Sequence, residues 1–252
     1  MAGHSKFKNI QYRKGAQDKK RAGLFSKLSK EITVAAKLGS PDPDQNARLR
    51  SAIQFAKASS FPKENIDRAI KKSLDKDTVN YDQMRYEGFG PAGTSIIVEA
   101  LTDNRNRTAS NVRSSFQKFG GSLGETGSVS HAFKHYGFLK FNKDVATEDE
   151  FFNFSIENGA EDCFVEEDEY EAVCLPDTMS KFYDLLAAKY GEPVSSGFQW
   201  RPDVLVKVDG DKLKSLINLI NELDSDEDVQ QIFSNFEASD EELSRIAWLI
   251  NF

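Results

Sequence analysis

Residues 163–175 read CFVEEDEYEAVCL, in which two apolar runs lie on either side of a group of acids. Two runs rich in apolar and aromatic residues, Cys163–Glu166 and Tyr170–Leu175, are separated only by acidic residues, a pattern typical of two strands joined by a turn. A helical spacing of apolar residues precedes the pair at Thr147–Asn158, and another follows it at Thr178–Tyr190. The sequence therefore predicts a hairpin with a helix on either side of it.

One further strand is predicted beyond each helix, at Phe138–Phe141 and at Val194–Trp200. The order is then strand, helix, strand, strand, helix, strand. This order is the split β-α-β of the ferredoxin-like fold. We predict one ferredoxin-like domain over residues 137–201.

The segments around this domain predict a second copy of the same order. Strand 94–101, helix 107–119 and strand 129–133 come before it, and strand 204–208, helix 211–223 and strand 229–236 come after it. The domain at 137–201 is therefore predicted to be inserted into a discontinuous ferredoxin-like domain over residues 80–136 and 202–239. Residues 75–77 and the polar residues after them are expected to form a linker, and residues 240–252 a closing helical tail.

The N-terminal part is predicted to be helical. Helices are expected at 18–38, 44–59 and 62–74, with Gly39 ending the first and Asp44 capping the second. Residues 1–74 then form a basic arm and a three-helix domain. The predicted fold is α+β: an N-terminal three-helix domain followed by two ferredoxin-like α+β domains, one inserted into the other.

Charge is divided unevenly along the chain. The first 30 residues hold nine Lys and Arg and a single acid, Asp18. Residues 1–72 carry a net charge of +11, and residues 73–252 carry −18. A cationic end of this kind is typical of a protein that binds a polyanion, while the acidic remainder repels one.

The basic segment also contains aromatic rings. Phosphates attract cations, and unpaired bases stack on flat rings. We predict nucleic-acid contact by His4, Lys6, Phe7, Lys8, Tyr12, Arg13, Lys14, Lys19, Lys20, Arg21, Lys27 and Lys30. Charge alone does not separate DNA from RNA as the partner.

Two arginines lie apart from this segment, between a predicted strand and a predicted helix. Arg105 and Arg107 either make a second contact with nucleic acid or pair with nearby carboxylates, and the sequence favours neither. Asn106 or Asp103 is expected to cap the helix.

Two glycine-rich stretches resemble phosphate-binding loops. Residues 88–93 match G-x-G-x-x-G, but Pro91 interrupts them and a strand follows, so a tight loop is predicted. Residues 120–128 contain four Gly. They suit either close approach to a phosphate or a helix-to-strand connection, and the structural interpretation is favoured.

No pattern indicates catalysis or a cofactor. We find no triad, nucleophile-elbow or P-loop spacing, so we predict no enzyme and no catalytic residue. His4, His131 and His135 do not form a metal-ligand pattern, and the acids 166–169 are expected at a solvated turn. Cys163 and Cys174 are expected to be reduced thiols, which favours a cytoplasmic protein. The chain has neither a membrane-spanning run nor a secretory signal, so no membrane partner is expected.

Several motifs together resemble the YebC/PmpR family, over nearly the whole length. The stretches that carry the resemblance are 1–6 (MAGHSK), 13–18 (RKGAQD), 46–50 (NARLR), 62–70 (PKENIDRAI), 85–91 (RYEGFGP), 101–108 (LTDNRNRT), 228–230 (DVQ) and 235–237 (NFE). The family usually has Trp where Phe7 stands and Gly where Ala92 stands.

The resemblance implies three domains, the third inserted in the second, and a non-enzymatic regulator of gene expression in a bacterial cytosol. Members are commonly described as DNA-binding transcriptional regulators. Others are ribosome-associated translation factors that help synthesis through stretches such as consecutive prolines. DNA and ribosomal RNA, with the ribosome, are thus the alternative partners; the sequence leaves the oligomeric state open.

Overall fold

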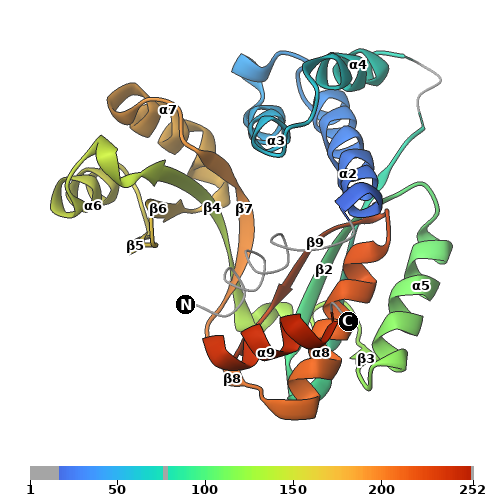
Figure 1. The fold of residues 1–252 in the computed structure, drawn as a ribbon. Helices are drawn as coiled ribbons and strands as arrows, with labels where there is room; N and C mark the ends of the chain where they lie inside the picture. The colour runs from blue at the N-terminus through green and yellow to red at the C-terminus, as the bar shows by residue number, and fades with distance from the viewer. Residues whose placement is uncertain (1–16, 76–78, 251–252) are drawn as a thin grey trace. The chain divides into compact units, whose positions relative to one another are not determined.

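A computed structural model describes residues 17–75 and 79–250 (Figure 1). Within these residues the protein is a mixed helix and sheet fold, in which a helical N-terminal region is followed by two four-stranded antiparallel sheets. Its described residues form two compact units. The first unit holds residues 17–27, 79–134 and 201–250, and the second holds residues 28–75 and 135–200.

Three helices make up the N-terminal region, as predicted: α2 (Gln17–Leu38), α3 (Ala47–Ala58) and α4 (Lys63–Ser73). Apolar side chains at helical spacing are buried on each of them. These buried residues are Leu28, Ile32, Ala35, Leu49, Ala56, Ile66 and Ala69.

The turn between α2 and α3 depends on one side chain that the sequence did not single out as a cap. Asn46, rather than Asp44, caps α3: its Oδ1 accepts a hydrogen bond from the backbone N–H of Leu49 at 3.0 Å. Its Nδ2 donates to the carbonyl oxygen of Ala35 at 2.8 Å. A Cβ atom at Gly39 would lie 2.6 Å from this Nδ2, so the close approach of the amide requires glycine there.

The first unit contains one of the sheets. Its strands are β1 (Asp82–Phe89), β2 (Ser95–Thr102), β3 (Ser122–Leu123) and β9 (Val229–Ser234), in the order β3-β1-β2-β9 with antiparallel neighbours. Helices α5 (Arg105–Lys118) and α8 (Gly210–Ser225) share a buried core with it. That core includes Ile96, Val98, Val112, Phe116, Leu216 and Ile220.

The order of this sheet is ferredoxin-like, but one strand comes from an unexpected part of the chain. β1 occupies the position that was predicted for residues 204–208. Of that predicted strand only β8 (Val206–Lys207) forms, and it pairs in parallel with β10 (Phe236–Glu237) outside the four-stranded sheet. The predicted strand at 129–133 is also wrong, because Ser130–Ala132 forms a 3-10 turn.

β1 was missed because it shows little of a strand's usual composition. Met84 and Tyr86 are its contributions to the core. The next residue on the same face is Gly88, where an added Cβ would lie 2.7 Å from the Phe116 ring and 2.7 Å from the carbonyl oxygen of Ser122. Close packing against a neighbouring strand thus removes an apolar side chain that would have marked the strand.

The second unit contains the other sheet, and here the prediction is confirmed. The elements are β4 (Phe133–Asn142), α6 (Glu148–Glu157), β5 (Asp162–Val165), β6 (Glu169–Cys174), α7 (Met179–Tyr190) and β7 (Ser195–Pro202). The strand order β5-β6-β4-β7 is that of a ferredoxin-like fold. Aromatic rings fill its core. The ring of Phe151 lies 5.0 Å from that of Tyr170 and 5.7 Å from that of Phe141, centroid to centroid.

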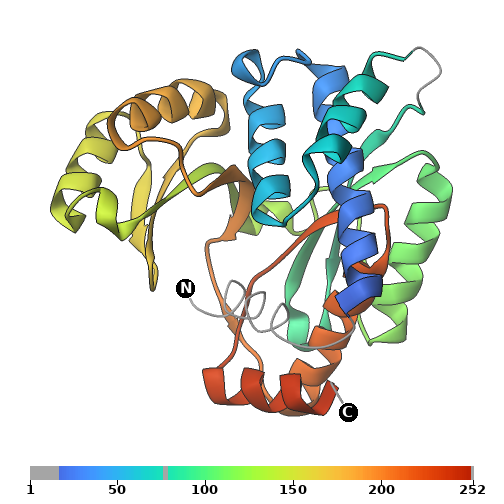
Figure 2. The same ribbon diagram turned by 45° about the horizontal axis from the view of Figure 1, so that its top comes forward.

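The closing helix predicted for the tail is α9 (Asp240–Ile250), which lies beside α8 (Figure 2). Leu243 and Ile246 are buried in the core of the first unit, so the tail is part of this fold. In the described part of the chain, no helix combines the length and the apolar character needed to cross a membrane.

Candidate nucleic-acid interface

The predicted contact residues are spread over three environments. Seven of them lie outside the described residues: His4, Lys6, Phe7, Lys8, Tyr12, Arg13 and Lys14. Lys19 and Lys20 belong to the first turn of α2, which begins at Gln17. These two lysines therefore continue directly from the basic arm.

Further along α2 the predicted cations differ in their accessibility. Arg21 is exposed, with its guanidinium carbon 5.3 Å from the ring centroid of Phe25 one turn later. Lys27 is buried, and its Nζ donates to Oδ1 of Asp224 at 3.0 Å and to the backbone carbonyl of the same residue. Asp224 lies in the last turn of α8, where carbonyl groups lack helical partners and a cation is favourable. The charge of Lys27 is thus paired with Asp224 within the first unit. Lys30 is half-buried.

Exposed cations that the sequence analysis did not select lie on α3 and α4. The side chains of four of them, Lys57, Lys63, Arg68 and Lys71, form no ion pair or hydrogen bond with another residue that the structure describes. By contrast, Arg48 on α3 makes a two-pronged contact with Glu31, at 2.7 and 3.1 Å. The sequence contained an indication of these four residues, because they contribute to the net charge of +11 over residues 1–72.

Arg105 pairs with a carboxylate, one of the two alternatives that the sequence left open. Its Nε and one terminal nitrogen each lie 2.8 Å from an oxygen of Asp82. The Arg105 guanidinium holds the pKa of the Asp82 carboxyl below its usual value, through these hydrogen bonds.

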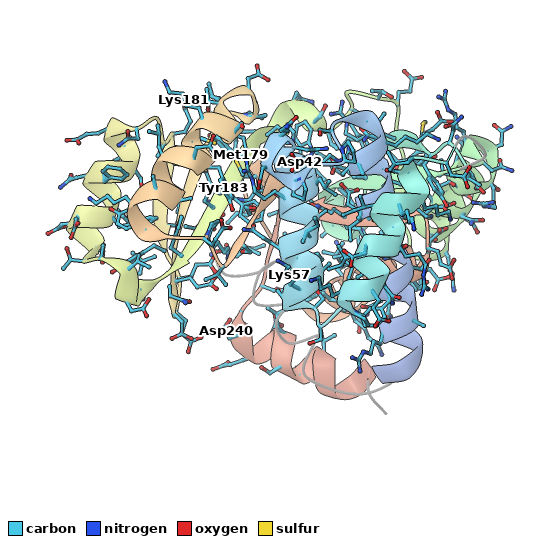
Figure 3. The ribbon with its side chains drawn as sticks, turned by 90° about the horizontal axis from the view of Figure 1, so that it is seen from above. Asp42, Lys57, Met179, Lys181, Tyr183 and Asp240 are labelled. Carbon is cyan, nitrogen blue, oxygen red and sulfur yellow. The ribbon has the colours of Figure 1, made fainter. Side chains whose placement is uncertain are left out.

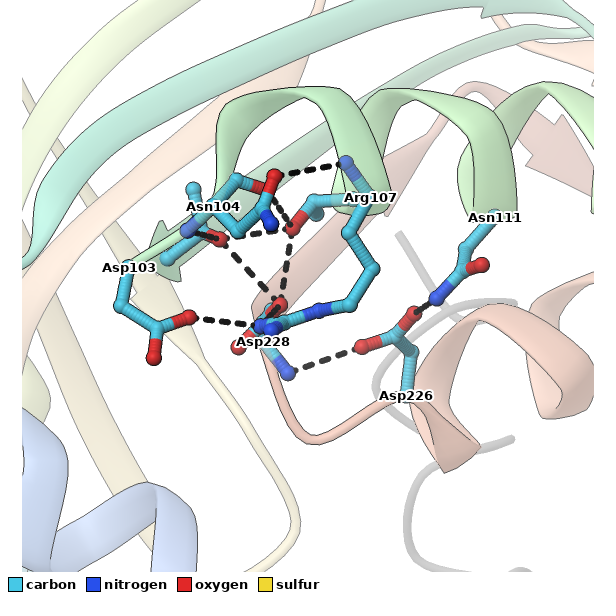
Figure 4. A network of polar contacts seen from close by, with 8 residues as sticks. Asp103, Asn104, Arg107, Asn111, Asp226 and Asp228 are labelled. Carbon is cyan, nitrogen blue, oxygen red and sulfur yellow. Dashed lines mark hydrogen bonds and ion pairs between the residues drawn. The ribbon is translucent and has the colours of Figure 1, made fainter.

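Arg107 lies at the edge of a polar network that joins β2, α5 and the start of β9 (Figure 4). One of its terminal nitrogens lies 2.7 Å from Asp103 and 2.7 Å from Asp228. The Asp228 carboxylate is buried and also accepts hydrogen bonds from the hydroxyls of Thr102, at 3.2 Å, and Thr108, at 2.7 Å. The hydrogen bonds that Arg107 donates to Asp228 and Asp103 raise the pKa of its guanidinium, so the side chain stays charged.

The same network fixes where α5 begins. Oδ1 of Asn104 accepts a hydrogen bond from the backbone N–H of Arg107 at 3.0 Å, so Asn104 is the cap, and not Asn106 or Asp103 as predicted. Residues 101–108 and 228 are therefore tied together as a structural unit. Both arginines use their charge within the first unit.

The glycine-rich residues 120–128 are held by a buried acid. The Glu87 carboxylate accepts hydrogen bonds from the backbone N–H groups of Val129, at 3.0 Å, and Ser130, at 2.8 Å, and Nε of Arg85 lies 3.2 Å from it. Burial raises the pKa of Glu87, but the backbone hydrogen bonds outweigh it and lower the pKa overall. The segment is therefore an anchored connection, which supports the structural interpretation.

The residues that match G-x-G-x-x-G also connect strands. Pro91–Gly93 forms a 3-10 turn between β1 and β2, with no helix opening after it. Ala92 adopts φ 62° and ψ 15°, in the left-handed region. This turn lacks the strand-to-helix context that a dinucleotide site requires.

Among the described residues, no group of three or more His, Cys, Asp and Glu is placed to hold a metal ion. Cys163 and Cys174 are buried and unbridged, and burial raises the pKa of each thiol to about 11. In the acidic turn between β5 and β6, Glu166 pairs with Lys140 at 2.7 Å. His135 stacks on Trp200, with ring centroids 4.5 Å apart.

Comparison with known proteins gives a consistent result. The model of the TACO1/YebC N-terminal domain matches residues 5–76, and that of the TACO1/YebC second and third domain matches residues 81–236. A protein of Zymomonas mobilis, named a probable transcriptional regulatory protein, is 49% identical over 246 residues, which are 98% of this chain and 99% of that protein. A crystal structure of a conserved hypothetical protein from Aquifex aeolicus is 37% identical with a TM-score of 0.78, covering 90% of this chain and 95% of that one.

Proposed function

This chain belongs to the TACO1/YebC family, and we propose that it is a non-enzymatic regulator of gene expression that binds nucleic acid. In its more specific form, the proposal is a cytoplasmic, DNA-binding transcriptional regulator. The name of the Zymomonas relative supports regulation of transcription.

The observation that carries the proposal is the separation of charge along the chain. Residues 1–72 carry a net charge of +11 and the remainder carries −18. Cations that neutralise phosphates release bound counterions, which is the main source of sequence-independent affinity for nucleic acids. The acidic remainder disfavours binding through the two sheets, so the N-terminal region is the part that contacts the polyanion.

The described cations support a contact that extends beyond the arm. Arg21 on α2 is exposed, and so are Lys57, Lys63, Arg68 and Lys71 on α3 and α4. We assign them to phosphate contact together with the predicted residues of the arm and of the first turn of α2. Lys27, Arg105 and Arg107 have carboxylate partners inside the first unit, so we assign them a structural role.

A second candidate function is a translation factor that binds ribosomal RNA on the ribosome. The interleaving of Phe7 and Tyr12 with cations favours it, because rings among cations suit unpaired bases. The partial burial of two polar side chains of α3 also favours the translation factor over a protein that reads DNA. Arg50 and Gln54, whose side chains could read base edges in DNA, are partly buried against Tyr183 in the arrangement of this structure.

The first test measures binding of the full-length protein to a DNA duplex and to an RNA of equal length over a range of salt concentrations. Each phosphate contact contributes a slope of about 0.9 for duplex DNA and about 0.7 for single strands in log affinity against log salt. We expect a steep loss of affinity for at least one probe. Affinity that does not respond to salt contradicts both candidate functions.

Charge reversal identifies the binding surface. Changing Lys6, Lys8, Arg13 and Lys14 to Glu is expected to abolish binding and leave the circular dichroism spectrum unchanged. The matched control reverses four exposed lysines of the two sheet regions, Lys181, Lys207, Lys212 and Lys214, and is expected to reduce binding much less. Crosslinking in cells then separates the candidates: promoter DNA supports transcription, and ribosomal RNA supports translation.

A further inference from the structure

Helix α3 carries a polar stripe on one of its faces. Arg50, Gln54 and Lys57 are spaced four and three residues apart, so their side chains lie on the same side of the helix. Arginine and glutamine are the side chains that most often read guanine and adenine, and lysine contacts phosphate. Lys57 is exposed, whereas Arg50 and Gln54 are partly buried.

The two partly buried members are covered by the ferredoxin-like domain of the second unit, through α7, the start of β7 and the segment between them. Nε2 of Gln54 donates to the Tyr183 hydroxyl and to Glu192, both at 2.8 Å, and its Oε1 accepts from the Ser196 hydroxyl at 2.8 Å. The guanidinium carbon of Arg50 lies 4.3 Å from the ring centroid of Tyr183. Figure 3 labels Tyr183 on α7 and Lys57 on α3.

The covering groups have the chemistry of a nucleotide. The Tyr183 ring offers Arg50 a flat π surface, as a base does. The carboxylates of Asp184, 3.7 Å from Arg50, and of Glu192 offer anionic oxygens, as a phosphate does. Burial raises the pKa of Tyr183 and Glu192 raises it further, so the phenol stays protonated and donates to Glu192.

The fit is nevertheless incomplete for Arg50. Its Nε is buried without a hydrogen-bond partner in the described part of the chain, and its nearest carboxylate is beyond hydrogen-bond distance. A partly buried guanidinium favours a two-pronged acceptor, such as a phosphate or the edge of a guanine, which would also bond to the buried Nε. The contact is therefore one that a stronger anionic ligand can displace.

We propose that the Arg50–Gln54–Lys57 stripe is a nucleic-acid-reading surface, and that Tyr183, Asp184, Glu192 and Ser196 cover it in a closed, self-inhibited arrangement. This inference rests on the proposed function. Nucleic acid competes with the acidic domain for the same side chains. The basic arm makes the first contact, and opening of the covered stripe adds the base-reading contacts.

The first experiment weakens the cover with the full-length double variant Asp184→Asn/Glu192→Gln. Both acids are exposed, so the fold tolerates the change. If the stripe is covered about 90% of the time, the apparent affinity is about tenfold lower than that of a fully open protein. The variant is therefore expected to bind a random-sequence DNA duplex or RNA up to about tenfold more tightly than the wild type does.

The matched control is Asp149→Asn/Glu157→Gln on α6. It removes two exposed acids from the same domain and gives the same change in net charge. We expect it to strengthen binding about twofold or less, through general electrostatics alone. Equal effects of the two double variants would overturn the inference.

The second experiment locks the cover. The hydroxyl oxygens of Ser51 on α3 and Ser196 on β7 lie 2.8 Å apart and both residues are buried, so Ser51→Cys/Ser196→Cys places two thiols at bonding range. Cys163 and Cys174 are buried thiols of raised pKa and do not compete. We expect the oxidised protein to bind several-fold more weakly than the reduced protein, and to recover on reduction.

The outcomes separate this inference from the proposed function. If the oxidised and reduced Ser51→Cys/Ser196→Cys proteins bind nucleic acid equally and with steep salt dependence, the proposed cover is overturned. The proposed nucleic-acid function then still stands. If neither the wild-type protein nor the Asp184→Asn/Glu192→Gln variant binds the DNA or the RNA probe, the inference and the proposed function are both overturned. Ser51→Cys and Ser196→Cys alone control for the substitutions and are expected not to respond to oxidant.

Discussion

The inserted sheet and the sheet of the first unit have the same strand arrangement but are held together differently. In the inserted sheet, Phe151 lies among the rings of Phe141, Tyr170 and Tyr190. In the other sheet, the buried carboxylates of Asp228 and Glu87 tie strand ends and loops together. The hydrophobic burial of these rings is non-directional, whereas a buried carboxylate needs defined hydrogen-bond donors. Asp228 bonds to Thr102, 126 positions away in the sequence, whereas the rings around Phe151 come from residues 141–190.

Removal of a central ring from the core of the inserted sheet is expected to cause the greatest loss of stability. Phe151→Ala removes a fully buried ring and leaves a cavity, which typically costs about 3–5 kcal/mol. Denaturant unfolding measures the loss, and hydrogen exchange should place it in the second unit. Phe152→Ala, at a half-buried neighbouring ring, is the control and should cost clearly less. Equal costs at both positions would contradict the central role of Phe151.

Removal of a buried carboxylate from the sheet of the first unit is expected to cost less stability. Asp228→Ala leaves the hydroxyls of Thr102 and Thr108 and the Arg107 guanidinium without their shared acceptor. Because Arg107 is partly solvated, we expect a loss of about 2–3 kcal/mol rather than the full cost of breaking a buried pair. Glu125→Ala, at an exposed acid of the same unit, should be close to neutral. A neutral Asp228→Ala would remove the distinction between the two sheets.

A pH titration tests the sheet of the first unit, because this sheet contains a buried acid of lowered pKa, Glu87. The pKa of Glu87 in the folded state lies below its unfolded value, so its stabilisation is complete above the unfolded pKa and is lost as the pH falls through the folded one. We expect protection of residues 124–130 from hydrogen exchange to decline from about pH 5 downwards. Glu87→Gln should remove this dependence, and an unchanged profile in that variant would assign the acid sensitivity elsewhere.

The smallest effect concerns one residue with left-handed backbone geometry in each unit. Ala92 has φ 62° and Ser60 has φ 57°, and both are strained for a residue with a Cβ atom. Ala92→Gly is expected to stabilise the first unit by about 0.5–1 kcal/mol, and Ser60→Gly to act similarly in the second. The readout is the midpoint of thermal unfolding. A destabilised Ala92→Gly protein would mean that contacts of the methyl group outweigh the strain.

The inserted sheet could be predicted because its apolar runs are strong and its elements follow one another in order. The sheet of the first unit could be predicted only in part. Residues 129–133 alternate like a strand, but the N–H groups of Val129 and Ser130 donate to Glu87 and are unavailable to a neighbouring strand. β1 was hidden because Gly88 replaces an apolar residue at a close contact.

The sequence predicted that the candidate interface lies in the N-terminal region, but the structure changed which residues are assigned to it. Lys27 looks like any other cation of the basic segment, since its partner, Asp224, is 197 positions away. Packing of the helices also decides which cations are exposed, as it does for Lys57, Lys63, Arg68 and Lys71. A count of charges in the sequence does not show this. The covering of Arg50 and Gln54 required the structure, because the covering residues lie in a separate domain.

The early position of β1 has a consequence for synthesis. Three strands of the first sheet, β1, β2 and β3, leave the ribosome before the inserted domain begins, whereas β9 follows only after that domain is complete. β2 pairs with β9, so its hydrogen-bonding edge, with Ile96 and Val98, stays open while the inserted domain folds. The nascent chain thus passes through a stage with an unfinished sheet edge, at which chaperone binding or mispairing competes with the arrival of β9.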